Sequence, residues 1–261
     1  MPSPIINRRL NSVPVSIPVL GDVLLINEST DFDGSANGAA IATWFDKSGY
    51  GHHWTSTACT VDKTRTANGH ATVRFDGATT FMQQPFFFAA GGYTGLEMMV
   101  VAKKDVNPPA GGNEGALVEF NHPVNFPSHH PYTDGTFYCG FARTDRPALA
   151  IPTTNISTAF RILNLSANSS NTLYNAWLDS ENFFTAAGGY TFQQQGLEIS
   201  QGATTGGPNY SLGRGWRYDL ANTFLTVLGN IAAVYCWKKQ LSTAERAAMR
   251  TYINGLFGTT A

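Results

Sequence analysis

The fold is decided by residues 231–258, which read IAAVYCWKKQLSTAERAAMRTYINGLFG. The first seven residues form a continuous apolar run, which is typical of a β-strand buried on both faces. Ser242 and Glu245 then stand three positions apart, the spacing of a capping box, so we predict that a helix begins here. Gly258 can close that helix as a left-handed cap. One apolar stripe runs along the predicted helix, formed by Ala248, Met249, Tyr252, Ile253 and Leu256.

The chain before this stretch consists of short apolar segments joined by turns rich in glycine, proline and asparagine. No helical pattern alternates with them, which argues against a doubly wound parallel sheet. We therefore predict an all-β fold, an antiparallel two-sheet jelly-roll sandwich with one C-terminal helix, in a single domain over residues 21–261. The best strand candidates are residues 23–26, 72–75, 96–102, 117–120, 136–141, 159–165 and 172–177.

The composition bears on which partners the protein binds. Lys and Arg number 17 against 18 Asp and Glu, a net charge of −1, so no electrostatic pattern favours nucleic acid. Charged residues make up 13% of the chain, about half of what is usual, which favours contacts between subunits and a homo-oligomer. We expect no membrane contact, because no apolar run is long enough to span a bilayer and no secretory signal is visible.

The cysteines indicate a reducing compartment. Cys59, Cys139 and Cys236 are far apart in the sequence and odd in number. Buried free thiols explain this pattern, with one disulfide and a spare thiol as the alternative.

The first 20 residues differ from the rest, because four prolines favour extended backbone and remove amide donors. A flexible tail is one interpretation. The many aliphatic residues favour the other, an arm that docks onto a neighbouring subunit. The residues that we expect to make this contact are Ile5, Ile6, Arg8, Arg9 and Leu10.

Four segments together resemble a known superfamily. They are WFDKSG at 44–49, ATVRFDG at 71–77, LYNAW at 173–177, and residues 229–258. In this order they resemble the concanavalin A-like lectin/glucanase superfamily, especially the laminin-G-like domains common in bacterial and phage proteins. The chain departs from that pattern at Ala233, where the family often has Glu, and in the third segment, which lacks the glycine of the family's Leu-Tyr-Val-Asn-Gly strand. The resemblance implies a jelly-roll, a fold that serves lectins, glycosidases, adhesins and structural modules alike.

Glycosidases of this fold use carboxylates in a Glu-x-Asp-x-x-Glu pattern on one strand, where one acts as nucleophile and another as acid. This chain has no such triplet, and the nearest imitation, ESTDFD at 28–33, has the wrong spacing. The remaining candidates, Glu97, Glu119 and Glu198, are isolated. We therefore predict that the protein is not an enzyme.

The histidines and aspartates suggest metal binding only weakly, and we predict no cofactor. Neighbouring residues of a strand point to opposite faces, so a histidine pair supplies only one ligand to a common ion. Ordinary hydrogen bonds in loops explain the histidines better; these are His52, His53, His122, His129 and His130. Calcium is the alternative at Asp31, Asp33 or Asp46, but the sequence after Asp46 is equally that of a side-chain-stabilised turn.

Two aromatic clusters could contact a sugar. One follows the Asp46 turn and the other lies in a glycine-bordered loop. Packing at the rim of the sandwich is the alternative for both, and it applies more strongly to Trp54 than to Trp216. The candidate glycan contacts are Tyr50, His52 and Trp54 in the first cluster and Arg214, Trp216 and Tyr218 in the second.

These observations favour a non-enzymatic phage virion protein. We expect a capsid decoration or cement module that its arm holds to the major capsid protein or other virion subunits, located in the virion and assembled in the host cytoplasm. The first alternative is a carbohydrate-binding adhesin of a tail or fibre. The second is a glycoside hydrolase.

Overall fold

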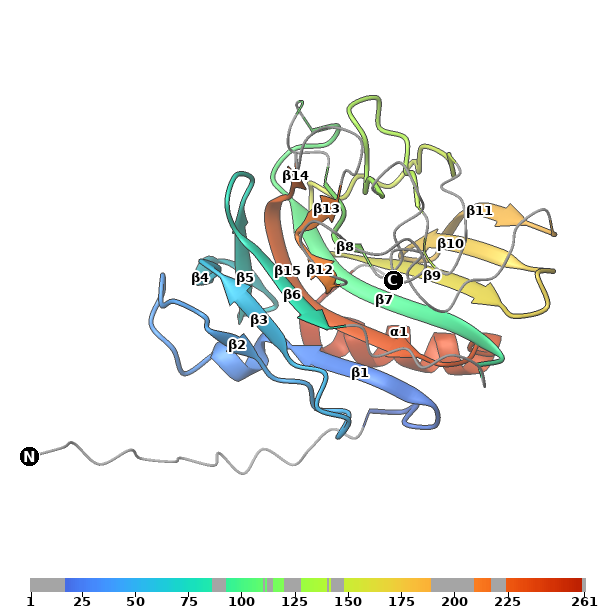
Figure 1. The fold of residues 1–261 in the computed structure, drawn as a ribbon, viewed down its shortest axis with the longest axis horizontal. Helices are drawn as coiled ribbons and strands as arrows, with labels where there is room; N and C mark the ends of the chain where they lie inside the picture. The colour runs from blue at the N-terminus through green and yellow to red at the C-terminus, as the bar shows by residue number, and fades with distance from the viewer. Residues whose placement is uncertain are drawn as a thin grey trace, which may run out of the picture.

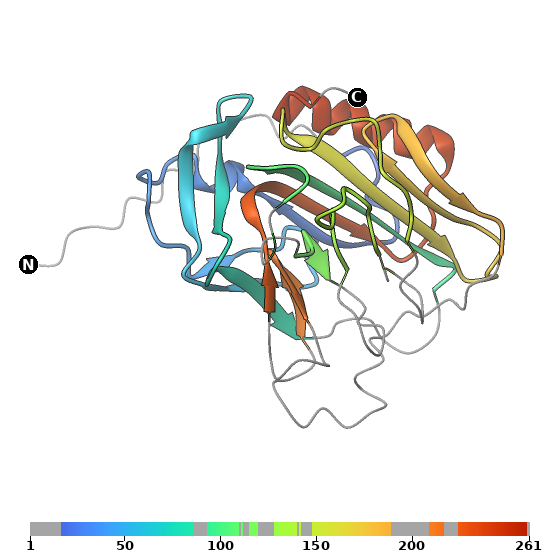
Figure 2. The same cartoon turned by 90° about the horizontal axis from the view of Figure 1, so that it is seen from above.

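The computed structural model describes residues 17–85, 93–109, 111, 115–119, 128–139, 141, 148–188, 209–216 and 224–259. Within them, two antiparallel sheets face each other and one α-helix follows at the C-terminus, which confirms the predicted fold class. Figure 2 shows helix, large sheet and small sheet as successive layers.

The large sheet has the order β11-β10-β9-β7-β15-β5-β4, and β1 also pairs with β15. Its strands are β1 (Val23–Glu28), β4 (Thr60–Ala67), β5 (His70–Asp76), β7 (Gly95–Lys104), β9 (Arg161–Asn168), β10 (Tyr174–Leu178), β11 (Glu181–Ala186) and β15 (Leu228–Trp237). The small sheet has the order β2-β3-β6-β12-β8. Its strands are β2 (Thr43–Trp44), β3 (Trp54–Thr57), β6 (Phe81–Pro85), β8 (Val118–Glu119) and β12 (Asn209–Leu212). A separate ribbon joins β13 (Arg214–Trp216) to β14 (Phe224–Thr226), and a 3-10 turn, η1, spans Ser29–Phe32.

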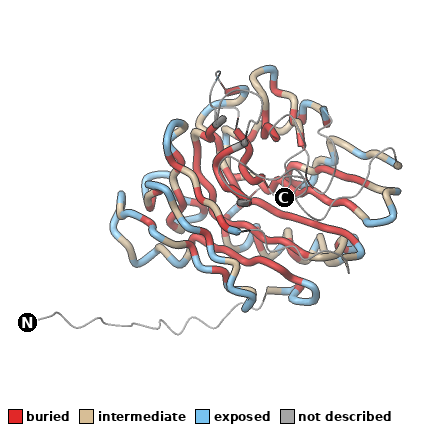
Figure 3. The backbone as a smooth tube through the Cα atoms, viewed as in Figure 1, coloured by how far each residue is buried: buried red, intermediate tan, exposed pale blue. Residues whose placement is uncertain are grey.

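Strand β15 is the centre of the molecule (Figures 1 and 3). It pairs with β7 along its length, while β5 takes the first part of its other edge and β1 takes the second part. Every residue from 229 to 237 is buried, as the apolar run predicted. The inner face packs against the small sheet and the outer face against the helix.

Helix α1 (Thr243–Phe257) covers part of the outer face of the large sheet. The predicted capping box is present: the Glu245 amide donates to Ser242 Oγ at 3.2 Å, and the Ser242 amide donates to the Glu245 carboxylate at 2.8 Å. Gly258 adopts φ 64° as the left-handed cap. The buried residues of the helix are Met249, Ile253 and Phe257, of which only Phe257 was not in the predicted stripe.

Most predicted strands are confirmed, and one is wrong. The described residues of this segment, 136–139 and 141, do not form a strand; Tyr138 makes only isolated bridges, to His129 and to Ala148. The aromatic pattern there is satisfied by packing, since Tyr138 and Phe137 contact rings of the neighbouring histidines. The sequence analysis missed β4 and β11, whose exposed and partly buried positions lack a strong apolar pattern. It also missed six short strands, which are β2, β3, β6, β12, β13 and β14.

The three cysteines are buried free thiols, as predicted. Burial raises the pKa of Cys59 and of Cys139 to about 12. Among the described residues, no helix has the length and apolarity that crossing a bilayer requires.

The expected arm falls largely on residues 1–16, which lie outside the described residues, and the boundary at residue 20 stays a prediction. The described end of this segment packs on the outer face of the large sheet. Val19 is buried, and its carbonyl accepts a hydrogen bond from Trp237 Nε1 at 3.1 Å. Ile17 packs against the same cluster, whereas Leu20 is 58% exposed.

Candidate functional site at the Asp46 loop

The Asp46 loop, residues 45–53, connects β2 to β3. Both of its ends are fixed by fully buried tryptophans that pair across the two strands. Trp44 Nε1 donates to the carbonyl of Glu28 at 3.2 Å, and Trp54 Nε1 donates to Asn27 Oδ1 at 2.9 Å. Trp54 is therefore a core residue, in agreement with the packing alternative.

Asp46 organises the interior of the loop. Its Oδ1 accepts hydrogen bonds from the amides of Ser48 and Ile26, both at 2.9 Å. Its Oδ2 accepts from Ser48 Oγ at 2.6 Å and from the His52 amide at 3.0 Å. The predicted side-chain-stabilised turn is confirmed, and the calcium alternative for Asp46 remains untested. These bonds also cover the free edge of β1, because the Lys47 amide donates to the Ile26 carbonyl at 2.7 Å.

The loop presents exposed aromatic side chains. Phe45 is 60% exposed and Tyr50 is 57% exposed. The Tyr50 ring stacks on His52, with centroids 5.9 Å apart and an interplanar angle of 4°. The Phe45 ring meets His53 edge-on at 5.1 Å. Each exposed ring is therefore supported from behind by a histidine, which restricts its orientation.

Hydrogen bonding and burial set the state of these histidines. His53 Nδ1 accepts a hydrogen bond from the Asp46 amide at 3.0 Å, so the neutral ring carries its proton on Nε2. Burial lowers the pKa of His52, against the opposing charge of Asp46. His52 is thus neutral at neutral pH and presents a π-face to Tyr50.

A charged group borders the loop. Lys47 Nζ lies 3.1 Å from Glu28 Oε2 and 2.8 Å from Asp31 Oδ1. Burial opposes the charge on Lys47, but Glu28 and Asp31 outweigh it and raise the pKa of the lysine. Burial raises the pKa of Asp31, with Lys47 acting against it.

The second predicted cluster is separate from the first. Strand β13 lies beside β8, at the edge of the small sheet opposite β2. Arg214 is largely buried, with its guanidinium carbon 3.5 Å from the centroid of the Phe81 ring, and burial lowers its pKa to about 10. The side chain of Trp216 and all of Tyr218 lie outside the described residues, so a glycan contact by this cluster stays a prediction.

The isolated carboxylates make structural hydrogen bonds. Glu28 accepts from the hydroxyl groups of Tyr235 and Tyr252, at 2.9 and 2.7 Å. Glu119 accepts from the amide and hydroxyl of Ser128. Glu97 is fully buried beneath α1, and Glu198 lies outside the described residues.

The histidine pair at 129–130 lies inside the molecule. His130 is fully buried, its Nδ1 accepts a hydrogen bond from the Leu117 amide at 3.3 Å, and burial lowers its pKa to about 3. His122 lies outside the described residues. In the part of the chain that the structure describes, no three His, Cys, Asp or Glu side chains come together as a metal site.

Sequence reasoning identified Tyr50 and His52 but missed Phe45. A signal was available, because Phe45 follows the end of β2 directly after the buried Trp44, and alternation turns it to the opposite side. The packing of His53 on Phe45 and of His52 on Tyr50 could not be predicted from the sequence, because it depends on the turn that Asp46 imposes on the loop.

No protein-family model and no curated protein matches this chain in sequence. Solved structures match it in fold. A botulinum neurotoxin type C chain, described for its interaction with two ganglioside molecules, matches 92% of this chain and 51% of its own, with TM-score 0.55 and 9% identity. The binding domain of botulinum neurotoxin DC in complex with rat synaptotagmin II matches 92% of this chain and 52% of its own, with TM-score 0.56 and 9% identity.

A mutant sialidase of Trypanosoma rangeli that displays trans-sialidase activity matches 94% of this chain and 35% of its own, with TM-score 0.53 and 11% identity. The chain therefore spans about half of the toxin chains and about a third of the sialidase chain. At these identities the likeness establishes the shared sandwich fold alone. The closer resemblance to laminin-G-like domains of phage proteins stays a prediction.

Proposed function

We propose that this protein is a non-catalytic recognition module whose Asp46 loop binds a glycan. The observation that carries the proposal is the pair of exposed aromatic side chains, Phe45 and Tyr50, on a loop with little freedom to move. A pyranose ring has an apolar face that packs on an aromatic ring, and a pre-ordered ring loses little entropy on binding. Matching structures whose descriptions mention a ganglioside or a sialidase support this choice of ligand.

The polar groups beside the rings suit a sugar as well. Lys47 and Asp31 form an ion pair in which each side chain is about one-third exposed. Each can therefore form a hydrogen bond with a sugar hydroxyl while keeping part of its contact with the other. The Tyr50 hydroxyl adds a hydrogen-bond donor and acceptor beside these two exposed rings. A site built from two rings and a few hydrogen bonds gives modest affinity per site, which suits a protein that binds in several copies.

The test is binding to a glycan array followed by titration of the best ligand. We expect Tyr50→Ala to weaken binding about tenfold, because one ring-stacking contact is lost. Ile151→Ala is the matched control, since Ile151 is also an exposed apolar side chain (61%) but lies outside the Asp46 loop. Equal affinity of wild type and Tyr50→Ala, with both folded, would refute the role of this loop.

We also propose that the protein has no glycosidase activity and needs no cofactor. Support comes from the carboxylates themselves, because Glu28, Glu97 and Glu119 are each occupied by hydrogen bonds that hold the fold together. Hydrolysis of any array-positive glycan that is lost in a single carboxylate variant would overturn this part of the proposal.

A second candidate is the virion decoration module, held by residues 1–16 to the major capsid protein or another virion subunit. Its supporting observation is the anchoring of Val19 on Trp237, which attaches the described end of the arm to the large sheet beside the exposed Leu20. The low charge of the chain supports many-copy assembly, and the three free cysteines suit assembly in the host cytoplasm.

The second candidate is tested by deleting residues 1–16, which spares the buried Val19. We expect the truncated protein to fold but to be missing from purified particles, with copy number measured by quantitative mass spectrometry. Unchanged incorporation would contradict the docking role of the arm. A handful of copies found on tails would favour the adhesin instead.

A further inference from the structure

A hollow of about 360 Å³ lies on the outer face of the large sheet, away from the Asp46 loop. Its walls come from the β4–β5 hairpin, from β7, from the segment before β9 and from the end of α1. Ala67, Phe160 and Phe257 form its apolar floor with only 1%, 7% and 1% of their surface exposed, while Arg65 and Lys103 supply positive charge. This volume is at the lower end of the usual range for small-molecule sites.

The hollow exists because α1 ends before it has crossed the whole sheet. The helix stops at Phe257, whose ring meets His70 on β5 at 6.1 Å. Asn68 Nδ2 donates to the carbonyls of Gly255 and Leu256, at 3.4 and 3.2 Å, and so attaches the hairpin tip to the end of the helix. The part of β4 next to this attachment is left without a covering layer.

A large bulge in β4 builds one wall. The register changes between Asp62, which pairs with Thr72, and Ala67, which pairs with His70. The extra residues of β4 leave the ladder between these two pairs. Bulges of this kind redirect side chains, and they are common beside functional sites.

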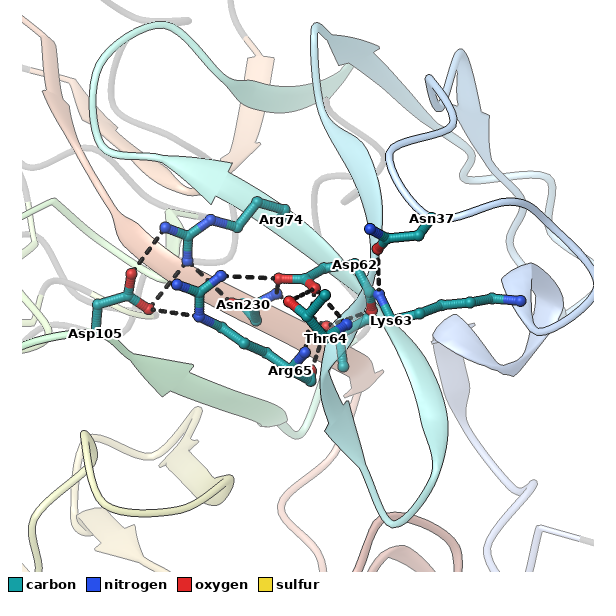
Figure 4. Close-up of polar contacts among 9 residues, drawn as sticks. Asn37, Asp62, Lys63, Thr64, Arg65, Arg74, Asp105 and Asn230 are labelled. Carbon is teal, nitrogen blue, oxygen red and sulfur yellow. Dashed lines mark hydrogen bonds and ion pairs between the residues drawn. The ribbon is translucent and has the colours of Figure 1, made fainter.

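Buried Asp62 fixes the shape of the bulge, as Figure 4 shows. Its Oδ1 accepts hydrogen bonds from Thr64 Oγ1 at 2.7 Å and from the amides of Thr64 and Arg65 at 2.8 and 3.1 Å. Its Oδ2 accepts from Asn230 Nδ2 at 3.0 Å. On the neighbouring strand β5, Thr72 Oγ1 donates to the Arg65 carbonyl at 2.9 Å. The wall therefore has a defined shape rather than that of a loose loop.

Around the hollow, three cationic side chains lie near two carboxylates. Arg74 binds Asp105 through both nitrogens of its fork, at 2.7 and 3.0 Å. Arg65 bridges the two acids, with NH1 3.2 Å from Asp62 and Nε 3.7 Å from Asp105. Hydrogen bonds outweigh burial and hold the pKa of Asp62 and of Asp105 below the usual range, so both are charged at neutral pH. Two arginines thus balance two aspartates.

Lys103 adds a third cation to two acids, and its charge also helps to lower the pKa of Asp105. Among the described residues no carboxylate forms an ion pair with its ammonium group, although the lysine lines the hollow and is only partly exposed. A half-buried cation beside apolar walls is favourable for an anion that also has an apolar face.

We propose that this hollow is a second binding site, for a small organic anion with a carboxylate on a six-membered ring. Lys103 and the exposed part of Arg65 contact the carboxylate, and Ala159 with the exposed edge of Phe160 contacts the ring. Sugar acids and aromatic acids share this chemistry, and the experiment separates them. The inference does not depend on glycan binding at the Asp46 loop, because the two sites share no residue.

The test is titration of the full chain, followed by amide chemical shifts, with glucuronate and benzoate as ligands and with glucose and inorganic phosphate for comparison. We expect saturable shifts at residues 64–68 and at Phe160 with one or both carboxylates. Binding of glucuronate alone assigns a sugar acid, and binding of benzoate alone assigns an aromatic acid. Glucose or phosphate binding here as tightly as the carboxylates would overturn the proposal, as would the absence of saturation at millimolar ligand.

The contribution of Lys103 is tested by Lys103→Gln. We expect about tenfold weaker binding and a weaker salt dependence than the wild type shows, because Arg65 keeps its charge. The matched control is Lys63→Gln, because Lys63 lies on β4, the strand that forms one wall, but its ammonium group donates to the Asp33 carbonyl, outside the hollow. Equal weakening by both variants, or by neither, would contradict the assignment.

Discussion

Glu97 illustrates how one buried carboxylate fixes the position of a helix. The side chain is fully buried on β7. It accepts hydrogen bonds from Asn164 Nδ2 at 3.0 Å, Ser166 Oγ at 2.9 Å and the Leu241 amide at 2.7 Å. Arg246 of α1 completes its environment with Nε at 2.7 Å and NH2 at 3.0 Å. Sheet, linker and helix thus meet at a single group.

Removal of this charge is expected to destabilise the protein strongly. In Glu97→Gln the Arg246 guanidinium loses its counter-ion in a largely buried place, so we expect a loss of about 3 kcal/mol in the free energy of unfolding. Urea unfolding measures it. Lys238→Gln is the control, because its pair with Asp22 is surface-exposed at 3.6 Å, and the expected change there is below about 1 kcal/mol. Equal effects of the two variants would contradict a structural role of Glu97.

At the scale of elements, the neighbouring strands β7 and β15 come so close at Gly229 that a glycine is required there. A Cβ atom at Gly229 would lie 2.4 Å from the Lys103 carbonyl oxygen and 2.9 Å from the Lys104 Cα, both backbone atoms. We therefore expect Gly229→Ala to destabilise the protein by about 3 kcal/mol or more. Gly255→Ala in α1 makes the matched comparison, since nothing lies within 4 Å of its added Cβ.

The helical variant should be more stable than wild type by about 0.8 kcal/mol, because alanine loses less backbone entropy than glycine in a helix. The measurement is the melting temperature of Gly229→Ala and of Gly255→Ala, each compared with that of the wild type. If Gly229→Ala had the same melting temperature as the wild type, the close approach of β7 to Gly229 would be wrong.

The elements differ in how far the sequence predicted them. The continuous apolar run of β15 and the capping box of α1 are local signals, and both are confirmed. Strand β4 escaped prediction because its bulge interrupts the alternation, although the turn Asn68-Gly69, with φ 52° and 84°, carried a hairpin signal. The strand predicted at 136–141 is wrong for the opposite reason: its residues have high β-propensity, but Tyr138 pairs only through isolated bridges with loop residues.

At the scale of the whole molecule, burial and hydrogen bonding predict how stability depends on pH. Burial first, then Lys104, lowers the pKa of His130 from 6.5 to about 3. Between these values the unfolded chain binds a proton that the folded protein does not, so stability falls as the pH drops below 6.5. Hydrogen bonds from Lys239 and Ser242 lower the pKa of Glu245 from 4.5 to about 2, which adds a further loss below pH 4.5 with the same sign.

The measurement is urea unfolding at several pH values from 7.5 to 4. For the buried His130 the slope approaches about 1.4 kcal/mol per pH unit, whereas solvent screening makes the contribution of Glu245 smaller. We expect His130→Gln to be less stable at pH 7.5 but to lose less stability down to pH 4.5. Parallel curves for the variant and the wild type would show that His130 does not carry this dependence.

The sequence by itself determined the sandwich class, the central strand, the terminal helix with its caps and the Asp46 turn, because each depends on contacts between near neighbours or on simple periodicity. Only the tertiary structure decided that Phe45 and Tyr50 are exposed together while Trp54 is buried. It also decided that Asp62, Asn230 and Arg74 meet beside a hollow. These residues are up to 168 positions apart, and their meeting depends on strand order and register, which residue patterns within single segments do not specify.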